Sequence, residues 1–290
     1  MVIYNLNVTT TNQSRFWDAF TEFHAALPSI NDAGGSGYYF ATPVVPAGAK
    51  NVSSLTAFFA FPGKTNTAEI DKLYDPLQTR LRGMPGIQTQ NMSIPFPTMN
   101  STIFTILLAG GKADATGDVS ILASRLYSKD LLTSKDGPHR LTSAWRSLRM
   151  DPYSAITGHV VAGGAVAANG ARVDSAVHPA WRKTVTHMLI SRGWNANATL
   201  AQQSAIIQNT TEVEIPILRS VEGPHTMGAY VNEAHGYEPG FQASFWGANY
   251  PRLYRLKQKW DPRGLFIARK GVGSEDWDDA GLCLVSRSTH

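Results

Sequence analysis

The residues best suited to chemistry are a tyrosine and an asparagine two positions apart, Tyr230 and Asn232, in a polar segment that ends near Gly236. Side chains two positions apart in an extended segment face the same side, so both can enter one pocket. A phenol can take a proton from an alcohol or a ring hydroxyl when neighbouring donors stabilise its ionised form. The pair therefore predicts a polar binding site, with a buried structural tyrosine and a turn asparagine as the alternatives.

Two histidines, His159 and His187, lie in segments with the apolar pattern of strands. Because an imidazole titrates near neutral pH, each is a candidate general base. A single strand histidine is more often a hydrogen-bonded residue of the core or the surface, and that alternative stays open for both.

Other catalytic motifs are missing from the sequence. It has one cysteine, Cys283, and contains neither H-E-x-x-H, G-x-S-x-G nor G-x-G-x-x-G. These patterns carry zinc protease, serine hydrolase and dinucleotide-binding chemistry. The sequence therefore predicts no metal site and favours neither hydrolysis nor phosphate binding.

Asn249 and Tyr250 precede Pro251 at the start of a predicted helix over 252–260. An asparagine followed by proline is typical of a helix N-terminus, so capping is one interpretation of Asn249. Apolar spacing predicts that the helix packs through Leu253, Leu256 and Trp260, and that the apolar residues 265–267 return to the core.

The remaining pattern predicts alternating strands and helices. Val2–Val8 alternates as a strand, and Asn12 is placed to cap a helix that Pro28 ends. Asn66 is placed to cap a second helix, which Pro76 bends. Strands are expected over 54–61, 87–94, 155–162 and 182–192, and helices over 119–127 and 138–147.

These elements lack the short parallel spacing of a doubly wound fold. They predict an α+β fold, in which a large antiparallel sheet is covered on one face by helices and keeps its other face open. No linker or internal repeat divides the 290 residues, so a single domain over 1–290 is expected, with 228–270 as its C-terminal segment.

The segment Gly228–Phe266, GAYVNEAHGYEPGFQASFWGANYPRLYRLKQKWDPRGLF, resembles the C-terminal segment of the berberine-bridge-enzyme-like, FAD-linked oxidases. The start of the chain, VIYNLNVTTTNQSRFWDAF, resembles that family's sequence just after its flavin-binding domain. The resemblance implies a substrate domain whose free sheet face covers a flavin. It implies that Tyr230, Asn232, Asn249 and Tyr250 contact the flavin, and that Tyr230 is the catalytic base.

FAD is thus the implied cofactor, although nothing before the match resembles the family's flavin-binding domain, so this chain alone is not expected to bind it. The first hypothesis is the substrate-binding half of an FAD-linked oxidoreductase acting on an aromatic, polyketide or alkaloid-type secondary metabolite. A flavin-free cyclase, isomerase or pericyclic catalyst is a second hypothesis, and a non-catalytic binding or dimerisation module is a third. The expected partners are a small aromatic or polyketide-like molecule and, on the open face, a flavin domain or a second copy.

Composition narrows the other partners. The net charge of +4, from 26 basic and 22 acidic residues without long runs, gives no nucleic-acid footprint. No apolar run reaches the length of a membrane span and no signal peptide is evident, so a cytoplasmic location is expected as encoded. Seven Asn-x-Ser/Thr sequons suggest secretory ancestry; they lie at Asn7, Asn12, Asn51, Asn91, Asn100, Asn197 and Asn209.

Overall fold

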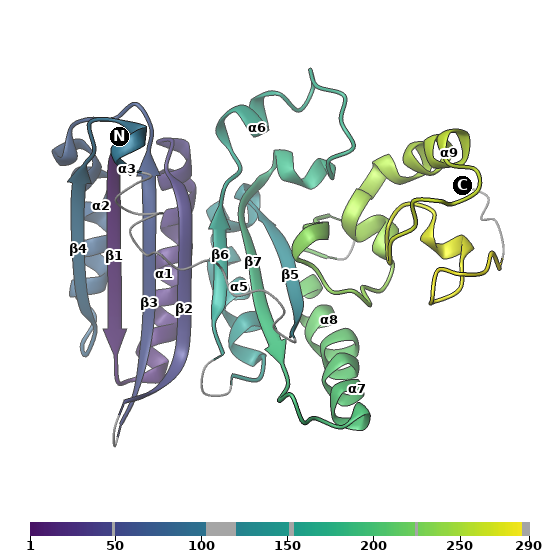
Figure 1. The fold of residues 1–290 in the computed structure, drawn as a ribbon. Helices are drawn as coiled ribbons and strands as arrows, with labels where there is room; N and C mark the ends of the chain where they lie inside the picture. Colours follow the sequence, from purple (N-terminus) through teal and green to yellow (C-terminus); the bar gives the residue numbers. More distant parts are fainter. Residues whose placement is uncertain (48–49, 103–119, 151–153, 224–225, 286–290) are drawn as a thin grey trace.

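The described residues form one seven-stranded antiparallel sheet in the order β4-β1-β3-β2-β6-β7-β5 (Figure 1). A computed structural model describes all residues except 48–49, 103–119, 151–153, 224–225 and 286–290. The strands are β1 (Val2–Thr10), β2 (Ser36–Ala47), β3 (Lys50–Phe61), β4 (Gln88–Pro95), β5 (Ser120–Ser128), β6 (Ile156–Val160) and β7 (Thr184–Gly193). The predicted antiparallel α+β fold is confirmed.

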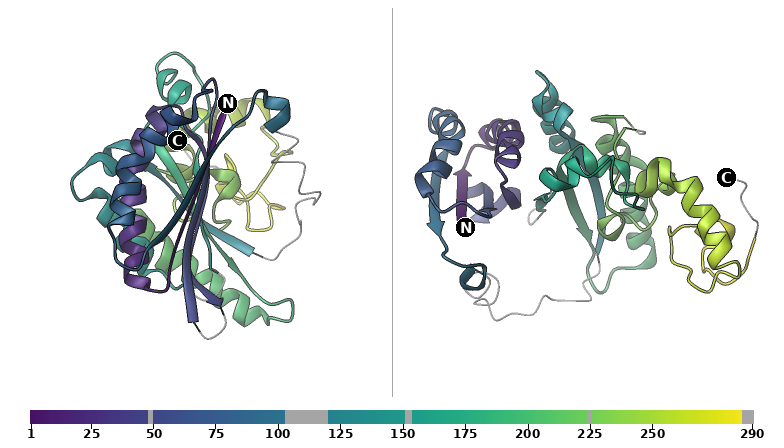
Figure 2. Two further views of the ribbon diagram at one scale, coloured as in Figure 1. Left: turned by 90° about the vertical axis from the view of Figure 1, so that its left-hand side faces the viewer. Right: turned by 90° about the horizontal axis from the view of Figure 1, so that it is seen from above.

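Helices cover one face of this sheet (Figure 2). The α-helices are α1 (Gln13–Asp32), α2 (Thr67–Arg82), α3 (Met99–Thr102), α4 (Lys129–Thr133), α5 (Gly137–Ser147), α6 (Gly164–Ala168), α7 (Leu200–Asn209), α8 (Ile215–Ser220) and α9 (Tyr250–Trp260). The long helices α1 and α2 lie behind β1 to β4 in Figure 1, and α5 lies behind the other strands. Among the described helices, none is both long and apolar enough to cross a membrane.

The main core lies between the sheet and these helices. Alternate strand residues such as Leu6, Tyr39 and Phe59 are fully buried against Phe23 and Leu27 of α1. Burying each such side chain stabilises the fold by about 1.5–3 kcal/mol. We call the opposite face, which these helices do not cover, the open face.

The predicted helix starts are correct, but the predicted proline end is wrong. Asn12 accepts a hydrogen bond from the backbone nitrogen of Arg15, and Asn66 accepts one from Ala68. Pro28 lies inside α1, which continues to Asp32. Proline removes one helical hydrogen bond, and the buried Leu27 and Ile30 on either side of it offset that loss.

The helix expected over 119–127 is also wrong, because residues 120–128 form β5 at the edge of the sheet. Tyr127 faces the helices and bonds to Trp145 of α5, whereas Leu126 packs under Ala180 and Met227. Both faces of the strand are therefore covered, which removes the polar and apolar alternation that identifies a half-buried strand. Val119 lies outside the described residues.

Candidate functional site

One residue from each strand forms a straight row across the open face. The pairing register sets Met92 of β4 beside Asn5, Asn5 beside Phe58, and Phe58 beside Tyr38. It continues from Tyr38 to His159, then to His187, and ends at Leu126 of β5. Directly paired residues lie on the same side of a sheet, so these seven residues, the cross-strand row, share one face.

Rings are in contact along the middle of the row. The ring centres of Tyr38 and Phe58 lie 5.4 Å apart, and those of Tyr38 and His159 lie 4.9 Å apart. His159 and His187 follow at 5.4 Å, and Tyr230 stands edge-on to His187 at 5.8 Å. The predicted residues Tyr230, His159 and His187, distant in sequence, are thus brought together.

A carboxylate completes this group. Glu233 Oε2 lies 3.2 Å from Nδ1 of His159 and 3.4 Å from Nδ1 of His187. Glu233 ends a short 3-10 turn, Val231–Glu233, which places its carboxylate over β6 and β7. We call His159, His187 and Glu233 the histidine cluster. Sequence reasoning missed Glu233; the available signal was an acidic side chain three residues after Tyr230 in the same polar turn.

Burial keeps both imidazoles uncharged at neutral pH. It lowers the pKa of His187 to about 3, helped by the nearby charges of His159 and Arg125. Burial also lowers the pKa of His159, although the Glu233 carboxylate partly opposes that shift. His187 is fully buried, and neither of its ring nitrogens has a hydrogen-bond partner among the described residues. Each neutral imidazole keeps one nitrogen lone pair that can bind a metal, whereas the low pKa of His187 makes it a weak base at neutral pH.

Tyr230 and Asn232 are held together as predicted, by a different geometry. The segment is not extended; it turns at Val231, and the Asn232 amide donates a 2.7 Å hydrogen bond to the Tyr230 hydroxyl oxygen. The indole of Trp181 stands edge-on to Tyr230 at 5.6 Å between ring centres. The donated hydrogen bond fixes the position of the phenol oxygen, and its own hydrogen stays available for another acceptor.

Asn249 and Tyr250 lie apart from Tyr230 and the histidine cluster, at the start of α9. The Asn249 amide donates to the backbone oxygens of Ser175 and Val177, and it does not cap α9 through its side chain. The buried Tyr250 hydroxyl donates to Glu275 at 2.5 Å and accepts from the backbone of Gly273. Burial first, and then the Glu275 contact, raise the pKa of Tyr250 well above its usual range. Flavin contact by these two residues stays a prediction.

The packing predicted for α9 is wrong. Its buried residues are Tyr250 and Tyr254, whereas Leu256 and Trp260 are exposed, as are Leu265 and Phe266 after the helix. The cause is polar burial: the Tyr254 hydroxyl donates to the buried Asp276, and Tyr250 bonds to Glu275. Tyrosine is less hydrophobic than leucine, so a prediction from hydropathy places the leucine side of the helix, and not the tyrosine side, against the core.

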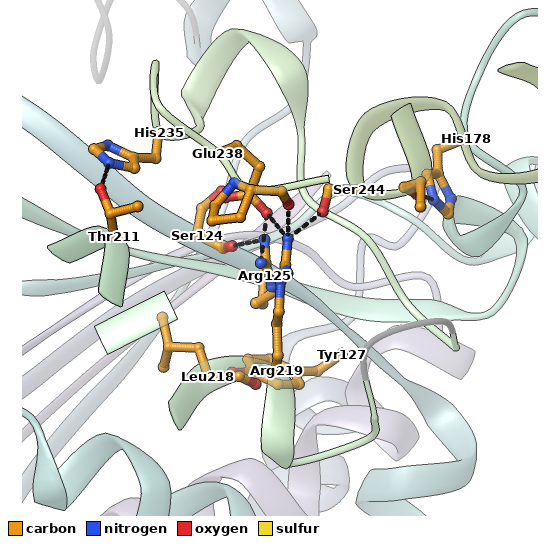
Figure 3. Close-up of polar contacts among 12 residues, drawn as sticks. Ser124, Arg125, Tyr127, His178, Thr211, Leu218, Arg219, His235, Glu238 and Ser244 are labelled. Carbon is orange, nitrogen blue, oxygen red and sulfur yellow. Dashed lines mark hydrogen bonds and ion pairs between the residues drawn. The ribbon is translucent and has the colours of Figure 1, made fainter. Parts of the chain in front are cut away.

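A buried ionic network anchors the segment that carries Tyr230 and Glu233 (Figure 3). Glu238 Oε1 accepts from Nη2 of Arg125 at 2.6 Å and from Nη2 of Arg219 at 2.7 Å. Arg219 also donates to the hydroxyl of Ser244 at 2.8 Å, and the backbone nitrogen of Leu126 donates to Gly228 at 2.9 Å. The C-terminal segment is therefore tied to β5 on both sides of Tyr230.

His178 has a structural role. Its Nδ1 accepts from the backbone of Ala180, and its Nε2 donates to the oxygen of Ala243. It thereby fastens the turn before β7 to the C-terminal segment.

Known proteins resemble this chain over nearly its whole length. Residues 229–273 match the family described as berberine and berberine like. An uncharacterized FAD-linked oxidoreductase of Arthroderma benhamiae is 42% identical over 97% of this chain and 48% of its own length. The FAD-linked oxidoreductase malF of Malbranchea aurantiaca is 34% identical over 97% of this chain and 45% of its own length. The chain thus spans about half the length of these curated relatives.

Solved structures agree with the fold. The VAO-type flavoprotein MtVAO713 of Myceliophthora thermophila superposes with a TM-score of 0.82 and 25% identity, over 95% of this chain and 49% of that one. The BBE-like 1 protein of Physcomitrella patens superposes with a TM-score of 0.61 over 94% of this chain and 54% of its own, and its 16% identity supports the fold only.

Proposed function

Because the chain belongs to the berberine-bridge-like family of FAD-linked oxidoreductases, we propose that it is the half of such an enzyme that binds and orients the substrate. The single observation that carries this proposal is the cross-strand row, which gathers Tyr38, Phe58 and the two histidines on the sheet face that the helices leave uncovered, with Tyr230 against His187 at its end.

The described residues fit a planar, partly polar group on this face. The rings of Tyr38 and Phe58 offer apolar surface, and Tyr38 is partly exposed. The exposed Asn232 adds an amide oxygen, which accepts hydrogen bonds. This mixture suits one side of a flavin and an aromatic substrate beside it. The chemistry that FAD supplies when bound is acceptance of a hydride from the substrate.

Tyr230 is the residue of this chain that exchanges the proton. Oxidation of a hydroxyl-bearing carbon removes a hydride from carbon and a proton from oxygen, and the ionised form of Tyr230, whose oxygen accepts from the Asn232 amide, takes that proton. Trp181 and the His187 ring flank Tyr230 and restrict its rotation. The substrate class we propose is an aromatic or polyketide-like secondary metabolite, because the exposed part of the row is aromatic.

A flavin-binding polypeptide is the partner that we propose for the open face. Tyr38, Phe40 and Met92 lie there with large exposed apolar side chains, and soluble proteins seldom leave such surface uncovered. Light scattering of the purified chain tests the competing occupant: a dimer that forms without any flavin polypeptide would favour a second copy on this face.

The test combines this chain with the part of the Arthroderma benhamiae relative that it does not match, either mixed or fused. Visible absorption of protein-bound flavin, and its bleaching by aromatic alcohols without oxygen, are the expected results. Tyr230→Phe should slow the bleaching by roughly 10²- to 10⁴-fold, the usual contribution of a positioned acid or base. Tyr237→Phe is the matched control, since Tyr237 packs on Arg269 away from the row.

Two outcomes would reject the proposal. Equal bleaching by the wild type and Tyr230→Phe would remove Tyr230 from the proton transfer. Conversion of a substrate by the colourless chain alone would favour a flavin-free cyclase or isomerase instead.

A further inference from the structure

We propose that the histidine cluster is a binding site for a divalent transition-metal cation, with zinc as the best match to its donors. The sequence predicted no such site, since its three ligands come from β6, β7 and the C-terminal turn and form no local motif. The donor atoms all lie within 4.8 Å of one another.

The distances match a metal more closely than a hydrogen-bond network. In a tetrahedral site with metal to ligand distances of about 2.1 Å, neighbouring donor atoms are about 3.4 Å apart. Glu233 Oε2 lies 3.2 Å from Nδ1 of His159 and 3.4 Å from Nδ1 of His187. Two edges of the tetrahedron thus have the length that a bound metal requires, and the two imidazole donors lie within 4.8 Å of each other.

Burial supplies an independent reason. His187 is fully buried, both of its nitrogens lack hydrogen-bond partners within the described chain, and Glu233 Oε2 lacks one as well. Leaving a buried polar atom without a partner is energetically unfavourable. A cation between the three side chains would satisfy Nδ1 of His187 and Oε2 of Glu233 together.

The donor set selects the metal class. Two imidazoles and one carboxylate suit zinc, and they also form the set that holds non-haem iron, whereas magnesium and calcium prefer oxygen donors alone. Three protein ligands leave a further coordination position. Because His159 and Glu233 are only partly buried, we infer that this position takes an oxygen ligand from the open face, either water or a hydroxyl or carbonyl oxygen of the substrate. The substrate part of this inference rests on the proposed function.

The experiment uses the untagged full chain, freed of metal by a chelator and titrated calorimetrically with Zn²⁺, anaerobic Fe²⁺ and Mg²⁺. One Zn²⁺ or Fe²⁺ per chain and no Mg²⁺ should bind. Co²⁺ is a spectroscopic probe, since tetrahedral coordination gives strong visible bands. Glu233→Gln and His159→Gln should each weaken Zn²⁺ binding by roughly ten- to hundredfold or more and remove the Co²⁺ bands.

Controls separate ligand loss from misfolding and from adventitious binding. His139→Gln and Glu212→Gln replace exposed residues of the same types elsewhere and should bind like the wild type. Circular dichroism and urea denaturation check that the cluster variants fold. Binding of Zn²⁺ that is unchanged in both Glu233→Gln and His159→Gln, or the lack of any stoichiometric binding, would overturn the proposal.

Acetohydroxamate, a bidentate oxygen ligand, probes the further position. A shift of the Co²⁺ bands on its addition is expected, and unchanged bands in the Co²⁺-loaded chain would overturn the open coordination position. None of these readouts requires flavin. A failure of the metal-site proposal can therefore be distinguished from a failure of the proposed oxidoreductase function.

Discussion

Replacing Glu238 with glutamine should strongly destabilise the C-terminal segment. Glu238 is almost fully buried, and its carboxylate forms ion pairs with the guanidinium groups of both Arg125 and Arg219. Glu238→Gln keeps the shape of the side chain but removes its charge. Arg125, also almost fully buried, would then hold a positive charge beside a second one with no compensating carboxylate, and burial already lowers the pKa of this arginine.

The size of the effect follows from the contacts that are lost. The two hydrogen bonds, at 2.6 and 2.7 Å, would lose their anionic acceptor, because the amide oxygen of glutamine carries no charge. Hydrogen bonds to charged groups contribute about 1.5–3 kcal/mol each, and breaking a buried ion pair from one side typically costs about 3–5 kcal/mol. We therefore expect the free energy of unfolding to fall by about 3–5 kcal/mol.

Urea denaturation measures this loss, and hydrogen exchange locates it. The amides of Leu126 and Ala229, which bond to Gly228 and Ser244, should lose protection before the amides of β1 and β3. Asp174→Asn is the control, because its carboxylate also accepts two hydrogen bonds from arginine, here from Nη1 and Nη2 of Arg252, but on the surface, where solvent screens the pair. A loss for Glu238→Gln no larger than that for Asp174→Asn would refute the reasoning.

Three further predictions concern the core and the surface. His24 is completely buried against Tyr39 and Phe20, and this burial lowers its pKa to about 4. Between pH 6.5 and pH 4 the histidine is therefore protonated in the unfolded chain but not in the folded one. Stability should therefore drop by about 2 kcal/mol from pH 7 to pH 5 through this residue, and urea denaturation of His24→Gln should show a correspondingly smaller drop. Gly158→Ala would put a methyl group 1.8 Å from a Tyr39 ring carbon, so calorimetry should show a loss of about 1–3 kcal/mol, and an unchanged melting temperature would contradict the packing described. In a secretory host the exposed sequons Asn91 and Asn197 should carry glycans, while Asn7, which is half-buried on the open face, should carry less. Peptide mass spectrometry after glycosidase treatment measures the occupancy of each sequon. Equal occupancy at all three would contradict the difference in exposure on which this prediction rests.

The architecture could be predicted because its pattern is local. The buried stripe of α1 and the alternation along β1 are visible within each segment. The edge strand β5 was mistaken for a helix because both of its faces are covered, so its residues do not alternate in polarity. The buried side of α9 was mistaken because its tyrosines are held by carboxylates that follow more than twenty residues later.

The candidate site could be predicted only in pieces. Tyr230, Asn232, His159 and His187 were each identified by residue type, but their convergence depends on the register between β2, β6 and β7, which no local pattern encodes. Glu233 was missed for the same reason, since an acidic residue in a polar turn is ordinary until two histidines are known to face it.

With the proposed function, the cross-strand row has a consequence for how the substrate of this fold can change. Each residue of the row comes from a separate strand, and its backbone is fixed by pairing on both sides in all but the edge strands. A replacement at Phe58, Tyr38 or Met92 would therefore alter the surface under a ligand without disturbing the core, which uses the alternate residues. Specificity can then diverge by single independent substitutions across one line of the sheet, and a family with this architecture can diversify its substrates while its scaffold is conserved in shape.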